Sequence, residues 1–227
     1  MTEQTEDSAT KNGATDDRAP AGGETAEVDF MAAERLIFFT DAVAAIAMTL
    51  LAFDLRVPDI AHMSNGAALT ALWGKPYRLS YLTFLISFVV IGNHWRAHHR
   101  LFRNVSRLDA RITSLNMVWL LMIVIMPFAT RVLSGTGAFG IRFSIYAVIQ
   151  VVAMLTALLM GRHIRANHLL RPGAPGPGGR YDDATLLAVA AMFAISIPIA
   201  FVTQWAFAVW VATVPAARLI SRLRQRS

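Results

Sequence analysis

Long apolar segments alternate with short polar connections along this chain. A helix needs about 20 mostly apolar residues to cross a hydrocarbon core about 30 Å thick. Runs of this length cover residues 36–57, 77–95, 112–133, 139–160, 184–202 and 203–220. The last two are continuous, and we divide them near Gln204 and Trp205, because a single helix would overshoot the bilayer and tryptophan favours the headgroup level. The pattern predicts an all-α membrane protein with six transmembrane helices over residues 31–223.

Two segments outside these runs have a different composition. Residues 1–30 contain eight acidic and two basic residues and few large apolar ones, which predicts a disordered acidic tail. Residues 171–180 read RPGAPGPGGR and predict a flexible Pro/Gly linker. The whole chain is 55% apolar and 16% charged, and it has no cysteine. Disulfides and thiolate metal sites are therefore excluded.

The basic residues predict the orientation of the chain. With six spans, the two ends and the even connections share one side, and 16 of the 21 Lys and Arg residues fall there. By the positive-inside rule both termini are cytoplasmic. The arginines cluster where lipid headgroups meet the helix ends, so the charge of +6 does not indicate a nucleic-acid partner.

The first span carries the most informative polar residues. Thr40 and Asp41 lie just inside its cytoplasmic end, and a carboxylate there needs a partner or a place at the interface. At 100° per residue, one face of this helix carries a mainly apolar stripe of Ala42, Ile46, Thr49, Leu50 and Phe53. Asp41 falls about 140° from Ile46. The stripe and the carboxylate should therefore face different neighbours, and the stripe either lines a central axis or packs against other helices.

The motif that opens this span resembles that of the transmembrane protein 175 family of potassium channels. That family starts its first span with Arg-x-x-x-Phe-Ser-Asp, and this chain has Arg35, Phe39, Thr40 and Asp41 at the same spacing. Threonine keeps the hydroxyl of the usual serine. The likeness continues through SFVVIGNHWRAHHRLFR (residues 87–103) and MPFA (residues 126–129), so it covers most of residues 35–134.

The resemblance implies a bacterial inner-membrane homotetramer in which four first spans line a pore for potassium ions. The family lacks the TVGYG filter, and so does this chain. The likeness implies a hydrophobic constriction, with Ile46 as the narrowest ring and Thr49, Leu50 and Phe53 on the next turns. Membrane lipids are expected partners, and no cofactor or bound metal is expected.

A polar network on the cytoplasmic side is expected from the same resemblance, in which second-span histidines are partners of the first-span Arg and Asp. Its members would hold the pore helix in place and would compensate the charge of the Asp41 carboxylate. The histidines would otherwise lie with the arginines at the headgroups. The expected network comprises Arg35, Thr40, Asp41, Asn93, His94 and His98.

Two other classes of function start from the same residues. His94-x-x-x-His98-His99 looks like one histidine box of a membrane di-iron enzyme, but such enzymes need about eight histidines and this chain has six. Asp41 is the clear carboxylate within a span, so a proton-coupled or proton-conducting transporter is the main alternative to a channel. The expected activity is not enzymatic.

Overall fold

The computed structural model describes residues 21–53, 55, 57–171, 173–174 and 183–212, and within these residues the regular structure is helical. The named helices are α1 (Ala21–Phe53), α2 (Asn65–Leu72), α3 (Lys75–Phe102), α4 (Ala110–Leu133), α5 (Phe139–Ala166) and α6 (Asp183–Val202). A further helical segment covers residues 206–212. Residues 1–20 of the tail predicted over 1–30, most of the predicted linker and the end of the last predicted span lie outside the described residues.

α1 begins at Ala21, earlier than the boundary predicted at residue 31. The intervening stretch contains alanine and glutamate, which favour helix, and acids near a helix start interact well with its dipole. α3 likewise runs past the predicted end of its span at residue 95 to Phe102, and α5 continues to Ala166. The helices outlast their apolar runs because hydropathy marks the membrane boundary, whereas a helix ends where its backbone hydrogen bonds end.

Four of the described helices are long and apolar enough to cross a membrane: Phe30–Phe53, Ala110–Leu133, Phe139–Ala166 and Asp183–Val202. α3 has the length, but its second half carries several polar and charged side chains. The chain turns at Gln204 and Trp205, where the sequence predicts the last break. Beyond that turn, Trp210 Nε1 donates a hydrogen bond of 3.0 Å to Ser196 Oγ on α6, so residues 206–212 fold back along it.

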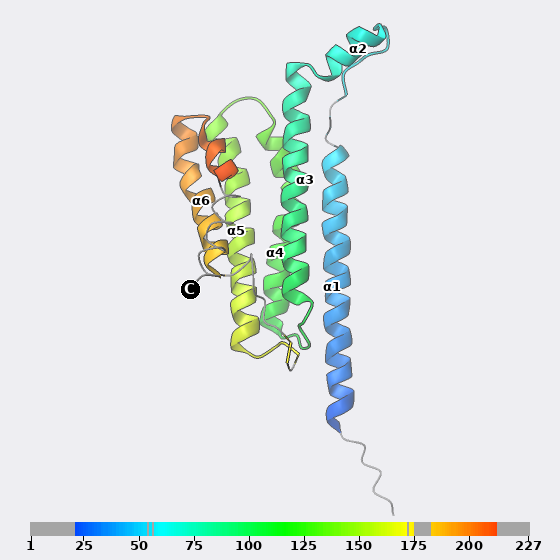
Figure 1. Cartoon of the computed structure of the whole chain (residues 1–227), viewed down its shortest axis with the longest axis vertical. Coiled ribbons are helices and arrows are strands. Elements are labelled where there is room, and N and C mark those ends of the chain that lie inside the picture. The colour runs from blue at the N-terminus through cyan, green and yellow to red at the C-terminus, as the bar shows by residue number, and fades with distance from the viewer. Residues whose placement is uncertain (1–20, 54, 56, 172, 175–182, 213–227) are drawn as a thin grey trace, which may run out of the picture.

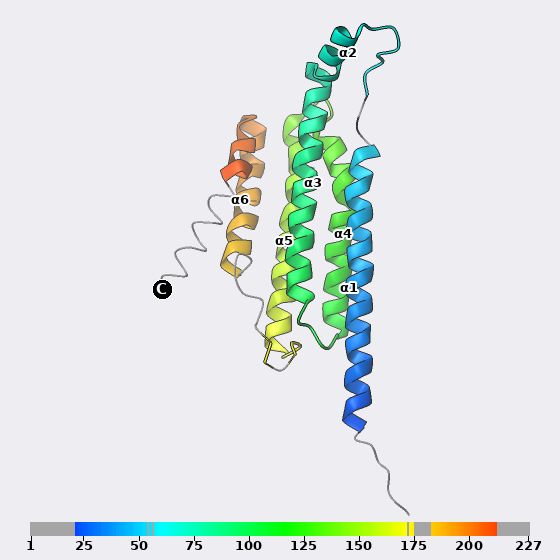
Figure 2. The same ribbon diagram turned by 45° about the vertical axis from the view of Figure 1, so that its right-hand side comes forward.

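The long helices lie side by side, with α1 at one edge and α6 at the other (Figure 1 and Figure 2). α1 packs against α3 and α4, α4 packs against α5, and α5 packs against α6. The core between them contains large buried side chains, including Trp119, Phe143 and Tyr146. Within the part of the chain that the structure describes, α1 therefore packs mainly against these two helices, and much of its surface is left uncovered.

Arginines gather at one end of this bundle, where α1, α4 and α6 begin and α3 and α5 end. Two loops join there, since Ser106 donates its backbone N–H to Leu169 O at 2.9 Å and Arg171 donates its own to Asn104 O at 2.9 Å. Described arginines at or near this end are Arg35, Arg96, Arg100, Arg103, Arg107, Arg111, Arg162, Arg165 and Arg171. This is the end for which the charge pattern predicts a cytoplasmic location.

Candidate functional site

α1 has a buried face and an exposed face. Ala44, Ala47 and Leu51 are 1–2% exposed and lie in the core. Small side chains such as alanine let helix backbones approach closely, which is the usual way that membrane helices pack. One face of α1 is therefore fitted against the rest of its own chain.

The opposite face carries the predicted stripe. Ile46 is 58% exposed, Leu50 44% and Phe53 87%, and Thr49 is also exposed. The Thr49 hydroxyl donates a hydrogen bond of 2.8 Å to Ile46 O one turn earlier. All four residues thus lie on a surface that the described part of the chain leaves open.

Thr40 and His98 are joined through a residue that the expected network did not include. Asn116 of α4 donates from Nδ2 to Thr40 Oγ1 at 3.0 Å, and its Oδ1 lies 2.6 Å from His98 Nε2. Thr40 and Asn116 are completely buried, and His98 is 2% exposed. With Oδ1 as the acceptor, His98 carries its proton on Nε2. The three side chains link α1, α3 and α4 at one level.

Asp41 is partnered by aromatic side chains of α3. Trp95 Nε1 donates to Asp41 Oδ1 at 2.8 Å, and His99 Nδ1 lies 3.4 Å from Asp41 Oδ2. The side chain of Asp41 is 26% exposed and that of His99 is 46% exposed. The carboxylate therefore turns sideways onto α3, away from the exposed stripe, as the helical angle predicts.

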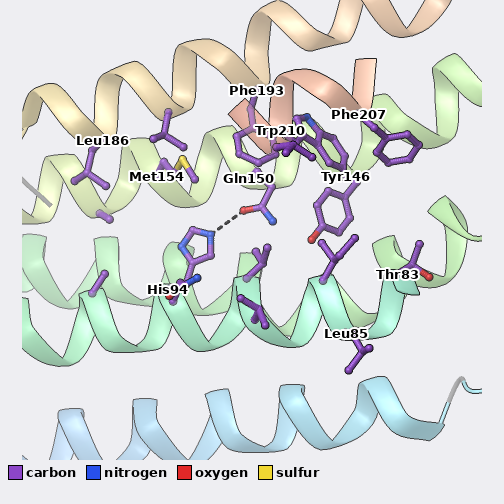
Figure 3. A pocket seen from close by; sticks show the side chains of 18 of the residues that line it. Thr83, Leu85, His94, Tyr146, Gln150, Met154, Leu186, Phe193, Phe207 and Trp210 are labelled. Atoms are coloured by element: carbon purple, nitrogen blue, oxygen red, sulfur yellow. Dashed lines mark hydrogen bonds between the residues drawn. The ribbon is translucent and has the colours of Figure 1, made fainter. Parts of the chain in front are cut away.

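His94 belongs to a separate polar cluster between α3 and α5. Its Nε2 lies 2.7 Å from Oε1 of the fully buried Gln150 (Figure 3). Nearby, Ser87 Oγ lies 3.3 Å from the hydroxyl of Tyr146 and accepts a hydrogen bond of 2.8 Å from Thr130. α5 is thus joined to α3 by polar contacts within the bundle.

The expected network is only partly brought together. Thr40 and His98 share Asn116, whereas Asp41 and His94 have different partners. Arg35 and Asn93 are exposed, and no hydrogen bond or ion pair joins either of them to the described residues of these clusters. The sequence reasoning missed Trp95, Asn116 and Gln150. A signal was present for the two amides, because a polar side chain within a predicted span needs a partner there.

The histidines do not form a metal centre in the described part of the chain, which holds no group of three His, Cys, Asp or Glu able to bind a metal ion. His94 and His98 each direct Nε2 to a different amide oxygen. The His98 ring also stacks between Phe102 and Trp119 at centroid distances of 4.3 and 4.4 Å. The imidazoles are arranged to fix helices rather than to surround an ion.

Together these features define a class: a multi-pass helical membrane protein whose first helix is fixed from behind by polar contacts and left open in front. The family model for the endosomal/lysosomal potassium channel TMEM175 matches residues 35–127. A potassium channel from Streptomyces collinus is 30% identical over 176 residues, covering 74% of this chain and 82% of that protein. The chain belongs to the TMEM175 family of channels, and it is not an enzyme.

The chain is also similar to a solved structure and to a vertebrate protein. The crystal structure of a lysosomal potassium-selective channel TMEM175 homologue from Chamaesiphon minutus superposes with a TM-score of 0.65. It is 24% identical, and the match covers 84% of this chain and 98% of that one, so it shows a shared fold. The endosomal/lysosomal proton channel TMEM175 of Gallus gallus is 36% identical over 107 residues, which are 44% of this chain and 21% of that protein.

Proposed function

We propose that this protein is a potassium-permeable cation channel of the bacterial inner membrane, in which four copies place α1 around a common axis. Each copy would cross the membrane six times, with α3 and the segment after Gln204 as the remaining spans and both termini in the cytoplasm. Family membership and the Streptomyces relative, which is named a potassium channel, support the activity. Permeant potassium would be the ligand, and membrane lipids the surroundings.

The observation that carries this proposal is the contrast between the two faces of α1. Its Ala44, Ala47 and Leu51 face is buried within the chain, whereas the face with Ile46 and Phe53 is open. An apolar stripe open on one side of a membrane helix must meet lipid, another subunit or a pore. The family relationship favours a neighbouring subunit or a pore. Copies arranged around a symmetry axis would place the stripe against both.

The side chains of the stripe suit a cation pathway without a carbonyl filter. Four Ile46 side chains around an axis would form an apolar constriction that gates by dewetting. The Thr49 hydroxyl donates its proton to Ile46 O, so its oxygen lone pairs remain free to accept from water or to contact a cation. Potassium gives up its hydration more readily than sodium, and a ring of such oxygens would favour it. Leu50 and Phe53 would line the wider part beyond.

The polar contacts behind α1 would act as positioning elements. Asn116 holds Thr40, and Trp95 with His99 holds Asp41, all on the side away from the stripe. A pore-lining helix must keep a constant rotation about its own axis, because a turn of one residue would move Ile46 off the centre. Contacts at two angles around the helix prevent that rotation.

Because the chain has no cysteine, the pore assignment is open to a direct chemical test. We expect a cationic methanethiosulfonate reagent to block potassium flux into liposomes by tenfold or more through Ile46→Cys or Thr49→Cys. Leu121→Cys is the matched control, since Leu121 is 52% exposed on α4 outside the proposed pore. Its modification should leave the flux within about twofold of the parent protein. Unchanged flux after complete labelling of Ile46→Cys would refute the assignment.

Proton conduction is the second candidate. The chicken relative is named a proton channel, and Asp41 with His99 forms a partly exposed carboxylate and imidazole pair. The same liposomes, loaded with a pH-sensitive dye, distinguish proton conduction from potassium flux. A proton current that survives Asp41→Asn and His99→Gln, but is blocked through Ile46→Cys, would place protons in the α1 pore rather than on this pair.

A further inference from the structure

The chain turns sharply at the end of α5. His168 follows the C-cap residue Asn167 with a φ of 51°, the left-handed conformation that glycine usually supplies after a helix. The N–H of His168 donates to Arg165 O at 3.5 Å. The N–H of Leu169 donates to Ile164 O at 3.1 Å, and both of these side chains are buried. This left-handed cap directs the chain back across the end of the bundle.

The redirected segment is fixed to the loop between α3 and α4. Val105 of that loop is 1% exposed and forms an antiparallel bridge with Leu170. The N–H of Arg171 donates to Asn104 O at 2.9 Å, and Arg171 O accepts from the N–H of Ala174 at 3.0 Å. Both backbone polar groups of Arg171 are thus engaged, so its side chain starts from a fixed backbone.

The side chain of Arg171 reaches α1. Its Cζ lies 4.1 Å from the centre of the Phe30 ring, which is the geometry of a cation–π contact. Phe30 is half-buried, and Ala33, one turn further along α1, is completely buried. α1 extends past the ends of the other helices here (Figure 1 and Figure 2). The contact therefore continues the packed side of α1 toward the start of the helix.

Helical geometry places Phe30 behind the exposed stripe. Ile46 follows Phe30 by 16 positions, so the two side chains point about 160° apart at 100° per residue. At 1.5 Å per residue, Phe30 lies about 15 Å from Thr40 along the axis. Thr40 and Asp41 are held at one level, which fixes the rotation of α1 but not its tilt. Packing beyond that level and the Arg171 contact before it restrain the tilt.

We propose that Arg171 is a positioning residue for α1, and that the connection after α5 thereby sets the tilt of the pore-lining helix. This inference rests on the proposed arrangement of four α1 helices around an axis. Ile46 lies about 9 Å beyond Thr40, so with Thr40 as the pivot a shift of about 1 Å at Phe30 would move Ile46 by about 0.6 Å. Opposite members of a ring of four would change their separation by about twice that amount.

Hydrogen exchange of the full-length protein in lipid nanodiscs tests the contact independently of transport. Arg171→Gln removes the charge and Phe30→Leu removes the ring. Each should speed amide exchange over residues 27–36 by about two- to fivefold, the shift that an exposed cation–π contact gives to an opening equilibrium. Arg171→Lys keeps a cation and Phe30→Tyr keeps a ring, so both should stay closer to the parent. Arg111→Gln, at an exposed position of α4, is the matched control and should exchange like the parent.

A double variant separates the contact from a general loosening of the helix. Arg171→Gln and Phe30→Leu remove the same interaction, so their combination should exchange no faster than the faster single variant. Independent effects would instead multiply.

The second readout is the ratio of potassium flux to sodium flux into liposomes. A pore helix that is free to tilt does not keep its ring at one width, so selectivity should fall. We expect Arg171→Gln and Phe30→Leu to lower the ratio by about twofold or more, and Arg171→Lys and Arg111→Gln to keep it. Phe30 points away from the stripe, so a changed ratio would not come from direct contact with the ion.

Three outcomes would overturn the proposal. The first is unchanged exchange in Arg171→Gln, and the second is multiplied effects in the double variant. The third is faster exchange with an unchanged flux ratio, which would show that Arg171 holds α1 without positioning the pore. A parent protein that carries no potassium would overturn the proposed function and the role in the pore together, and the exchange data would still show whether Arg171 holds α1.

Discussion

Asn116 offers the sharpest test of how α1 is held. It is fully buried and makes the only hydrogen bonds that join Thr40 to His98 in the described part of the chain. Leucine has the same number and branching of side-chain heavy atoms, so Asn116→Leu removes the amide without opening a cavity. The change breaks both hydrogen bonds and leaves His98 Nε2 without its acceptor.

The cost follows from these contacts. Hydrogen bonds between membrane helices contribute about 0.6 kcal/mol each on average. A buried polar group left without a partner costs about 1–3 kcal/mol more. We therefore expect Asn116→Leu to lower the free energy of unfolding by about 2–4 kcal/mol. Thr40→Val removes one of the two bonds and leaves the buried Asn116 Nδ2 without its acceptor, so its expected cost is about 1.5–3.5 kcal/mol.

A double-mutant cycle measures the coupling directly. The free energies of unfolding of the parent, Asn116→Leu, Thr40→Val and the double variant are compared by denaturant titration in detergent micelles. Because either single variant breaks the Thr40–Asn116 hydrogen bond, the double variant should be less destabilised than the sum by about 0.5–1 kcal/mol. Ser114→Leu, at an exposed position of α4, is the control and should cost less than about 0.5 kcal/mol. Strictly additive losses, or a parent-like Asn116→Leu, would show that this bond does not hold α1.

Two further predictions concern the carboxylates near the arginine-rich end of the bundle. Trp95→Phe keeps an aromatic ring but removes the indole N–H that donates to Asp41, so a loss of about 1–2 kcal/mol is expected in the same titration, and an unchanged midpoint would contradict the contact. The backbone N–H of Ile112 lowers the pKa of Asp109, and His163 at 2.5 Å lowers it further. A lowered pKa stabilises the fold above the unfolded value near 4 and less as the pH falls through it. Asp109→Asn keeps a capping side chain but no charge, so its melting temperature between pH 3 and 6 should vary less than the parent's, and equal slopes would refute this role.

The two faces of α1 were accessible from the sequence, because they depend on local helical geometry. The 3.6-residue period places Ile46, Thr49, Leu50 and Phe53 on one side of any helix that contains them. The same period separates Asp41 from that side. The structure agrees on both points, with the stripe open and the carboxylate turned onto α3.

The partners of the polar residues were not accessible in the same way. Asp41 accepts a hydrogen bond from Trp95 and lies beside His99 rather than His94 or His98, and Thr40 reaches His98 through Asn116. These contacts join residues 54, 76 and 18 positions apart in the chain. The sequence shows which polar side chains would need a hydrogen-bond partner when buried. It does not show which of several polar side chains on other helices that partner is.

The sequence by itself determined that this is a helical membrane protein, because apolar runs of membrane length leave few other structures open to the backbone. It also determined the family, through a motif confined to neighbouring residues, and the face of α1 on which each side chain lies. Only the tertiary structure decided which amide meets which imidazole, and that the connection after α5 reaches α1. Those features depend on how helices distant in the chain rotate and pack against each other, and no local pattern carries that information.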